Sequence, residues 1–291
     1  PEAPVIEVVA ALPSGSRIGR DFVLPESRLG KALLGGSNRR NDFFIGVLLL
    51  LGVAQLGVHL VQLRVLDLPD WLGVRIGMDL LLFVMAVMAG RVIPMFTNNG
   101  VPGTHARRHP AIEWAALAAV LALLIADAAG LHGVALAVLL GVCALAHVLR
   151  LLLWQPWRTL RTPLVWVLHA AYLWIVLHLA LRGLAELGWV AASLAAHALT
   201  VGAVGSLTLG MMIRTSRGHT ARELRADGVE LACFLAVNAA ALLRVGLPLA
   251  VPAATMMAVL GSALLWCAAF ALFTLRYWPI LTRARLDGKP G

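Results

Sequence analysis

Histidine is the residue type in this sequence with the clearest chemistry. The chain has nine histidines, and five of them fall inside long apolar stretches: His59, His147, His169, His178 and His197. Ionisable side chains are costly inside a bilayer and usually have a partner or a function there. Neutral imidazole is also a common ligand of haem iron and of copper. Each histidine alone suits a hydrogen-bonded packing role, but five together predict a haem or metal site.

The position of each histidine along its stretch separates them by depth. In the orientation derived below, His59 and His178 lie toward the outer face. His147 and His169 lie toward the inner face, and His197 is nearest the middle. A haem held between two helices needs two histidines at similar depth, so both pairs are candidates. His169 and His178 are about 180° apart around a helix and cannot serve one site from the same face.

Two polar segments add arginines at the inner face. The segment GRVIPMFTNNG (90–100) predicts a helix end at Pro94 followed by a turn, and RTSRGHT (214–220) predicts a second turn. Arg91 and Arg214 suit an anion such as a haem propionate, because guanidinium matches carboxylate geometry. The alternative is ordinary positive charge on cytoplasmic loops. His219 lies in the second turn.

Composition places these residues in a membrane protein. The chain of 291 residues is 60% apolar and only 13% charged, whereas a soluble domain is about a quarter charged. The net charge of +9 does not indicate nucleic-acid binding, because long apolar runs interrupt the basic residues. These residues suit loops that face anionic lipid. The three cysteines lie inside apolar runs and have no disulfide or thiolate-ligand spacing.

The hydrophobic pattern predicts an all-α polytopic bundle of about eight spans. An extramembrane arm or loop (1–42) precedes a transmembrane helical domain (43–276), and a cytoplasmic tail (277–291) follows it. Each span is near the length of about 20 residues that crosses the hydrocarbon core. The predicted spans are 43–65, 72–93, 112–130, 133–153, 163–182, 187–213, 229–247 and 252–276.

The loop charges predict that both ends of the chain are cytoplasmic. All of the 24 Lys and Arg fall on one side of the bundle except Arg64, Arg75, Arg182 and Arg244. Positive loops stay in the cytoplasm, which predicts a multi-pass membrane protein with the lipid bilayer as its first partner.

Other polar or small residues in the spans have structural and functional interpretations. Asp79 suggests either a proton path or an ion pair at the outer rim with Arg75 or Arg244. Asn238 is expected to form an interhelical hydrogen bond. Gly202, Ser206 and Gly210 recur every four residues and predict a close helix contact.

The sequence resembles the NnrS family in four segments that occur in order. These are RRNDFF (39–44), GRVIPMFTNNG (90–100), TPLVWVLHAAYLWI (162–175) and HALTVGAVGSLTLGMMIRTSRGHTAREL (197–224). NnrS proteins are bacterial inner-membrane proteins described as containing haem and copper, and they are associated with denitrification and protection from nitric oxide. The family implies roughly twelve helices, so we expect this chain to lack the family's N-terminal helices.

The resemblance predicts a b-type haem, with copper as a second cofactor, and a role in the response to nitric oxide or related nitrogen oxides. Its matching segments favour His169, His197 and His219 as cofactor-binding residues, with Arg91 and Arg214 as polar partners. A membrane electron donor is a further expected partner. The residues show no catalytic constellation, so no reaction is assigned.

Two other classes of function remain open. A cofactor-free proton-coupled transporter or channel would use Asp79, the intramembrane histidines and Asn238 to line a polar path. An assembly or sensor subunit would use the helices mainly to bind a partner protein.

Overall fold

The computed structural model describes residues 43–288, and every regular element in that range is helical. Within it, eight helices are long and apolar enough to cross a membrane. The predicted all-α, polytopic architecture is therefore confirmed. The predicted arm (1–42) lies outside the described residues. The orientation of the bundle stays a prediction.

The helices follow one another with short connections. Their bounds are α2 (Phe43–Gln62), α3 (Asp70–Gly100), α4 (Pro110–Ala128), α5 (Gly133–Leu153), η2 (Pro156–Arg158), α6 (Pro163–Glu186), α7 (Ala192–His197), η3 (Ala198–Val204), α8 (Gly205–His219), α9 (Gly228–Ala250), η4 (Pro252–Ala254) and α10 (Thr255–Leu281). Proline is the first residue of α4, η2, α6 and η4, a position where its missing N–H costs no intrahelical hydrogen bond.

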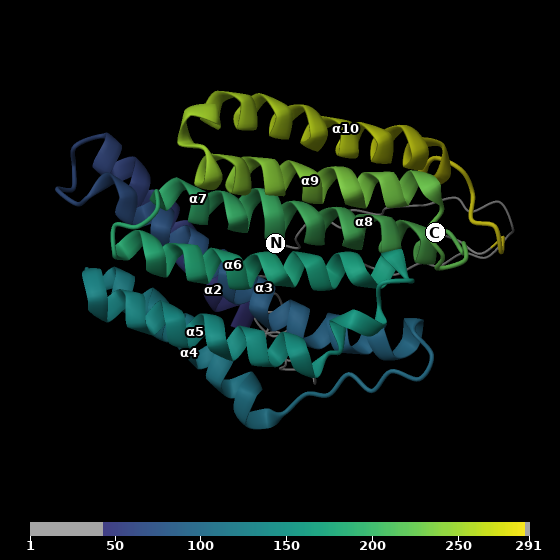
Figure 1. Cartoon of the computed structure of the whole chain (residues 1–291), viewed down its shortest axis with the longest axis horizontal. Coiled ribbons are helices and arrows are strands. Elements are labelled where there is room, and N and C mark those ends of the chain that lie inside the picture. Colours follow the sequence, from purple (N-terminus) through teal and green to yellow (C-terminus); the bar gives the residue numbers. More distant parts are fainter. Residues whose placement is uncertain (1–42, 289–291) are drawn as a thin grey trace, which may run out of the picture. The chain divides into compact units, whose positions relative to one another are not determined.

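The helix α6 is at the centre of this arrangement. It contacts α3, α5, α7, η3, α8 and α9, and α10 covers the far side of α9. Figure 1 shows this order, with α5, α6, the α7–α8 helix, α9 and α10 side by side. In keeping with this position, most of α6 is buried, including His169, Tyr172, His178 and Arg182, and exposed residues such as Leu173 and Leu177 lie on one stripe of the helix. Groups on α6 are therefore shielded from lipid and water at several depths.

Several predicted boundaries are wrong. Residues 90–100 form no turn, because α3 continues as a helix through Pro94 to Gly100. The predicted turn at 214–220 is helical as well, because α8 continues to His219 instead of ending at residue 213. The sixth span begins at Ala192 rather than at residue 187, and α10 continues to Leu281, into the predicted tail. Proline costs less inside a membrane helix that neighbouring helices pack against.

The side chain of Asn98 explains why the polar end of α3 is helical. Its Nδ2 donates to the carbonyl of Ala106 at 3.0 Å, and its Oδ1 accepts from the amide of Ala106 at 2.7 Å. The loop that follows α3 therefore folds back along the last helical turn. The side-chain amide of Asn98 therefore binds the following loop and does not form a turn at Asn98, as the sequence had suggested.

The sixth span is one helix from Ala192 to His219 with a π-helical segment inside it, η3. Here the predicted close contact is confirmed. A Cβ on Gly202 would overlap the indole of Trp174 on α6, and a Cβ on Gly210 would lie 2.9 Å from Val167. Trp174 also donates to Asn238 of α9 at 3.1 Å, which confirms the predicted interhelical hydrogen bond.

Candidate functional site

A buried arginine joins α3, α4, α5 and α6 in the half of the bundle predicted to be cytoplasmic. The guanidinium of Arg150 donates to the two carboxylate oxygens of Glu113 at 2.9 and 2.6 Å, and to the carbonyl of Ala86 at 2.7 Å. It also donates to the hydroxyl of Tyr172 at 3.1 Å. Gly90 makes room for it, because a Cβ there would overlap the guanidinium. Arg150 is thus fully partnered, which is what a buried charge requires.

Two of the predicted histidines lie on either side of an aromatic pair next to this arginine. His147 forms a hydrogen bond with the Tyr172 hydroxyl at 2.6 Å. The ring of Trp154 lies 4.6 Å from that of Tyr172 and 6.4 Å from that of His169, measured between centroids. The structure therefore brings His147 and His169 to one cluster, with Trp154 and Tyr172 between them.

The imidazole of His169 is fixed through one nitrogen only. Its Nε2 shares a hydrogen bond of 2.8 Å with the Thr97 hydroxyl of α3, while its Nδ1 is buried and has no hydrogen-bond partner among residues 43–288. The indole nitrogen of Trp154, in the same cluster, is also buried and without a partner there. Two neighbouring polar groups that lack partners are exceptional in a packed interior.

His178 shows the same pattern at a different depth. Its Nδ1 is bonded to the carbonyl of Ala195 at 2.8 Å, and its buried Nε2 has no partner in the described part of the chain. His169 and His178 contact different helices, α3 and α7, as their spacing predicts. His147 also keeps one buried ring nitrogen without a hydrogen-bond partner in the described part of the chain, its Nε2, while its Nδ1 bonds the Tyr172 hydroxyl.

The remaining predicted histidines have other surroundings. The Nε2 of His197 lies 2.6 Å from a guanidinium nitrogen of Arg244, so its lone pair is engaged. His59 is exposed and bonds Gln55 on its own helix, and His219 is exposed at the end of α8. His59 and His178 do not form a buried pair. His197 directly precedes η3, and π-helical turns often occur at functional sites.

The two predicted arginines lie on different helices and differ in their contacts. Arg91 is half-buried on α3 and follows Gly90. Arg214 is buried on α8 with its guanidinium 3.7 Å above the ring of Phe96.

A second charged cluster occupies the opposite end of the bundle. Arg182 on α6 bonds Asp79 at 2.7 Å and also pairs with Asp127. Arg75 bonds Asp127 at 3.4 Å and Glu186 at 2.8 Å. The interpretation of Asp79 as an ion-pair residue is correct, but its partner is Arg182 rather than Arg75 or Arg244. One oxygen of Asp79, Oδ2, is buried and lacks a partner within residues 43–288.

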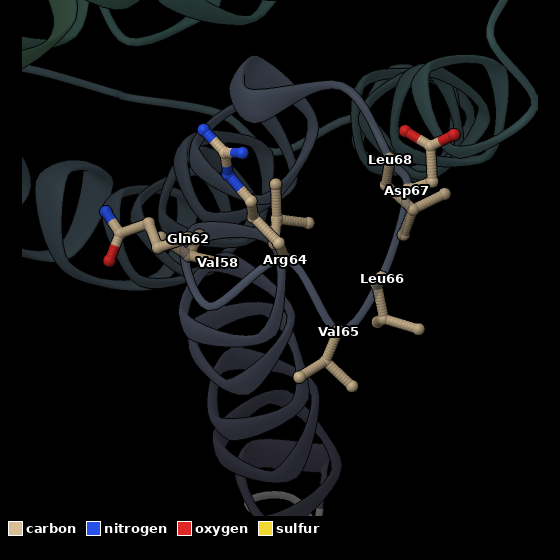
Figure 2. Close-up of a pocket in the computed structure, with 8 residues that line it drawn as sticks. Val58, Gln62, Arg64, Val65, Leu66, Asp67 and Leu68 are labelled. Atoms are coloured by element: carbon tan, nitrogen blue, oxygen red, sulfur yellow. The ribbon is translucent and has the colours of Figure 1, made fainter.

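Two pockets lie beside the connection between α2 and α3. The larger, about 740 Å³, is lined by residues from Val58 to Leu68, and the other, about 460 Å³, by apolar residues of α2, α3 and α4. Figure 2 shows Arg64 and Asp67 pointing to the same side of this connection and Val65 pointing away. Neither of these two pockets is lined by a predicted histidine.

Comparison with known proteins places this arrangement in a family. A family model described as NnrS protein matches residues 24–285. The chain belongs to the NnrS family. No curated protein and no solved structure gives a match. The histidine cluster, the two arginine networks and the π-helical segment of this NnrS protein all lie inside the matched range.

The donor atoms of this NnrS protein favour one kind of metal group over another. No group of three or more His, Cys, Asp or Glu that could hold a metal ion occurs in the described residues. Fewer ligands are needed by a haem, which takes one or two imidazoles. His147, His169 and His178 each offer a buried ring nitrogen without a partner among residues 43–288. The hydrogen bond on the other nitrogen fixes the ring, as in metal-bound histidines.

Several features of the site could not be read from the sequence. The pairing of Arg150 with Glu113 joins positions 37 residues apart in the chain, on two different helices. Trp154 looks like an interfacial tryptophan in the sequence, but it is fully buried. The one local feature of the sequence that relates to this site is Gly90, the first residue of the GRVIPMFTNNG segment. Because it has no side chain, it leaves space for the guanidinium of Arg150.

Proposed function

We propose that this NnrS protein binds a b-type haem through His169 and acts in the response to nitric oxide or related nitrogen oxides. The observation that carries the proposal is the pair of buried atoms without partners, His169 Nδ1 and Trp154 Nε1, whose rings lie 6.4 Å apart. A ligand with a metal ion that binds the imidazole nitrogen and a nearby acceptor for the indole N–H would give both atoms a partner. The family's association with nitrogen oxides suggests the biological setting.

The surroundings of His169 supply what a haem ligand needs. Thr97 holds the ring through Nε2 and leaves Nδ1 as the donor atom, and Trp154 offers an N–H for a polar group next to the metal. Burial keeps the imidazole away from water. The haem would contribute iron that binds nitric oxide and exchanges electrons, whereas the protein would set its polarity and access.

Copper and the electron donor belong to the same proposal but have less support. Imidazole suits copper as well as haem iron, so metal analysis must accompany spectroscopy. His178 is the second ligand candidate, at another depth and toward α7.

The test uses the full chain purified in detergent. The reduced-minus-oxidised optical spectrum and the iron and copper content should show stoichiometric haem, and His169→Gly should lose it. Added imidazole should restore the haem spectrum of His169→Gly, because the free ligand fills the space of the missing ring. His178→Gly tests the second candidate in the same way. His219→Ala, at an exposed position, is the control and should keep its haem.

A haem-free spectrum from well-folded wild-type protein would refute the proposal. An unchanged haem content in His169→Gly would refute the assignment of His169. A loss that imidazole does not reverse, together with a lowered melting temperature, would mean that His169 stabilises the fold and does not bind the cofactor.

A second candidate function has one specific observation in its favour. The cluster of Arg75, Asp79, Asp127, Arg182 and Glu186 holds two cationic and three acidic side chains, and Asp79 Oδ2 lacks a partner in the described chain. Such a group suits proton-coupled transport. The test measures proton entry into vesicles that contain the protein. Proton entry that Asp79→Asn abolishes would establish this function, and proton entry equal to that of vesicles without the protein would exclude it.

A further inference from the structure

The structure contains three buried arginines in its described part, and one of them has no acidic partner. Arg150 is bonded to Glu113, and Arg182 to Asp79 and Asp127. Arg214 is 8% exposed, yet no carboxylate lies within ion-pair distance of it, and no hydrogen bond to its side chain occurs among residues 43–288. A buried charge without a counter-charge is strongly unfavourable. Arg214 therefore differs from the other two in needing a partner from outside the described chain.

The aromatic ring beside Arg214 meets only part of this need. The guanidinium lies 3.7 Å above the ring of Phe96, and a cation is attracted to the face of such a ring. The ring accepts no ordinary hydrogen bond. The guanidinium nitrogens are not among the fully buried atoms that lack a partner, so a group from outside the described chain can reach them. An anion at the edge of the guanidinium could bind while the ring covers its face.

The neighbouring arginine in the RTSRGHT segment does have a carboxylate partner, so the lack of one is particular to Arg214. Arg217, one turn further along α8, bonds Glu230 of α9 at 2.5 Å, and Glu230 also accepts from Tyr277 of α10. The bundle thus supplies a carboxylate for Arg217 but none for Arg214. General positive charge at this end of the helices does not explain the difference.

The packing of α8 determines which side of the helix Arg214 is on. Gly210, one turn before it, lies directly against Val167 and Leu168 of α6. Phe96, the ring under Arg214, precedes Thr97, which holds the ring of His169. Arg214 therefore lies where α8 meets α3, beside the residues that position His169.

We propose that Arg214 binds an oxyanion, a carboxylate or a phosphate, at the junction of α3 and α8. The planar guanidinium donates two parallel hydrogen bonds to either group. One source is a carboxylate of the bound haem, and this reading rests on the proposed function. The other is the phosphate of an anionic lipid, which is concentrated at the cytoplasmic leaflet.

The test compares Arg214→Gln with Arg161→Gln in the full chain. Arg161 is exposed in the loop before α6 on the same side of the bundle, so the control removes the same charge. The first arm titrates each protein with haem and with haem dimethyl ester, which lacks free carboxylates. The second arm measures the melting temperature with phosphatidylglycerol and with phosphatidylcholine.

If Arg214 holds a haem carboxylate, Arg214→Gln weakens haem binding about tenfold or more and leaves binding of the ester unchanged. If it holds a lipid phosphate, the extra stabilisation by phosphatidylglycerol is lost in Arg214→Gln and kept in Arg161→Gln. Arg214→Lys should retain part of either effect, because it keeps the charge but loses the paired hydrogen bonds.

Two outcomes would overturn the proposal. Arg214→Gln that matches wild type in both arms, or an equal loss for haem and its ester without a lipid effect, would show that Arg214 binds no oxyanion. The two arms also separate this inference from the proposed function. If the wild-type protein binds no haem, the proposed function fails, and the melting temperatures with lipid alone decide whether Arg214 binds an oxyanion. The absence of any response in wild type to either anion would also refute the site.

Discussion

Gly90→Ala is the substitution for which the structure predicts the largest effect from the smallest change. A Cβ at this position would overlap the guanidinium of Arg150, and Glu113 lies 3.1 Å from the same point. The far end of an arginine side chain usually moves away at little cost. Here it is held by Glu113, the Ala86 carbonyl and the Tyr172 hydroxyl, so moving it breaks these bonds in a buried environment.

The expected magnitude follows from the pair that is broken. Separating a buried ion pair costs about 3–5 kcal/mol, whereas replacing glycine by alanine within a helix contributes about 1 kcal/mol of stability. Gly90→Ala should therefore lower the free energy of unfolding by about 2–4 kcal/mol. For a protein of this size the melting temperature should fall by roughly 5–15 °C.

The assay is thermal unfolding of the detergent-purified protein, with Gly77→Ala as the matched control on the same helix. A Cβ on Gly77 meets nothing within 4 Å, so that variant should melt within a few degrees of wild type. In the background Arg150→Met with Glu113→Gln, Gly90→Ala should cost little, because the guanidinium is gone. A large loss in that background as well, or none in wild type, would refute the reasoning.

Two further predictions concern charges at the two ends of the bundle. Arg182→Gln should destabilise the protein by about 3–5 kcal/mol, and Asp79→Asn by less, because removing Arg182 leaves Asp79 without a cation and Asp127 with only the more distant Arg75. Unfolding midpoints that reverse this order would contradict the assignment. Asp227→Ala should cost about 1 kcal/mol by removing the N-cap of α9. Burial opposes ionisation of Asp227, but the hydrogen bonds of the cap hold its pKa below the usual value. The contribution of the cap is therefore complete above the ordinary aspartate pKa and disappears as the pH falls through the lowered one, where melting curves of variant and wild type should converge.

The sequence was sufficient to predict the class of fold and the number of spans. Hydrophobic length is a local property, and each stretch carries it independently of the others. The boundary at Pro94 was wrong for a related reason. Proline removes one hydrogen bond within its own helix, but whether the helix survives depends on packing by α6 and on the loop contact made by Asn98. Neither is visible in the local sequence.

The candidate site could be predicted in its parts but not in its pairing. Histidines inside apolar stretches are conspicuous in the sequence, and depth alone put His147 and His169 at one level. The choice of Arg182 as the partner of Asp79 depends on which helices are neighbours. Because α6 lies at the centre of the bundle and contacts α3, Arg182 of α6 reaches Asp79 of α3. The π-helical segment after His197 had no signal in the residues.

Whether the polar groups have partners separates the structural from the functional residues of this membrane protein. Arg150 is buried, but it is bonded to a carboxylate, a carbonyl and a hydroxyl, so its role in the fold explains its presence. His169 keeps a buried nitrogen without a partner, and Arg214 a buried charge without a counter-charge, in the part of the chain described here. The two residues contact adjacent positions of α3, Thr97 and Phe96. An imidazole suits iron and a guanidinium suits a carboxylate, so the single haem that we propose would provide a partner for each of these two groups.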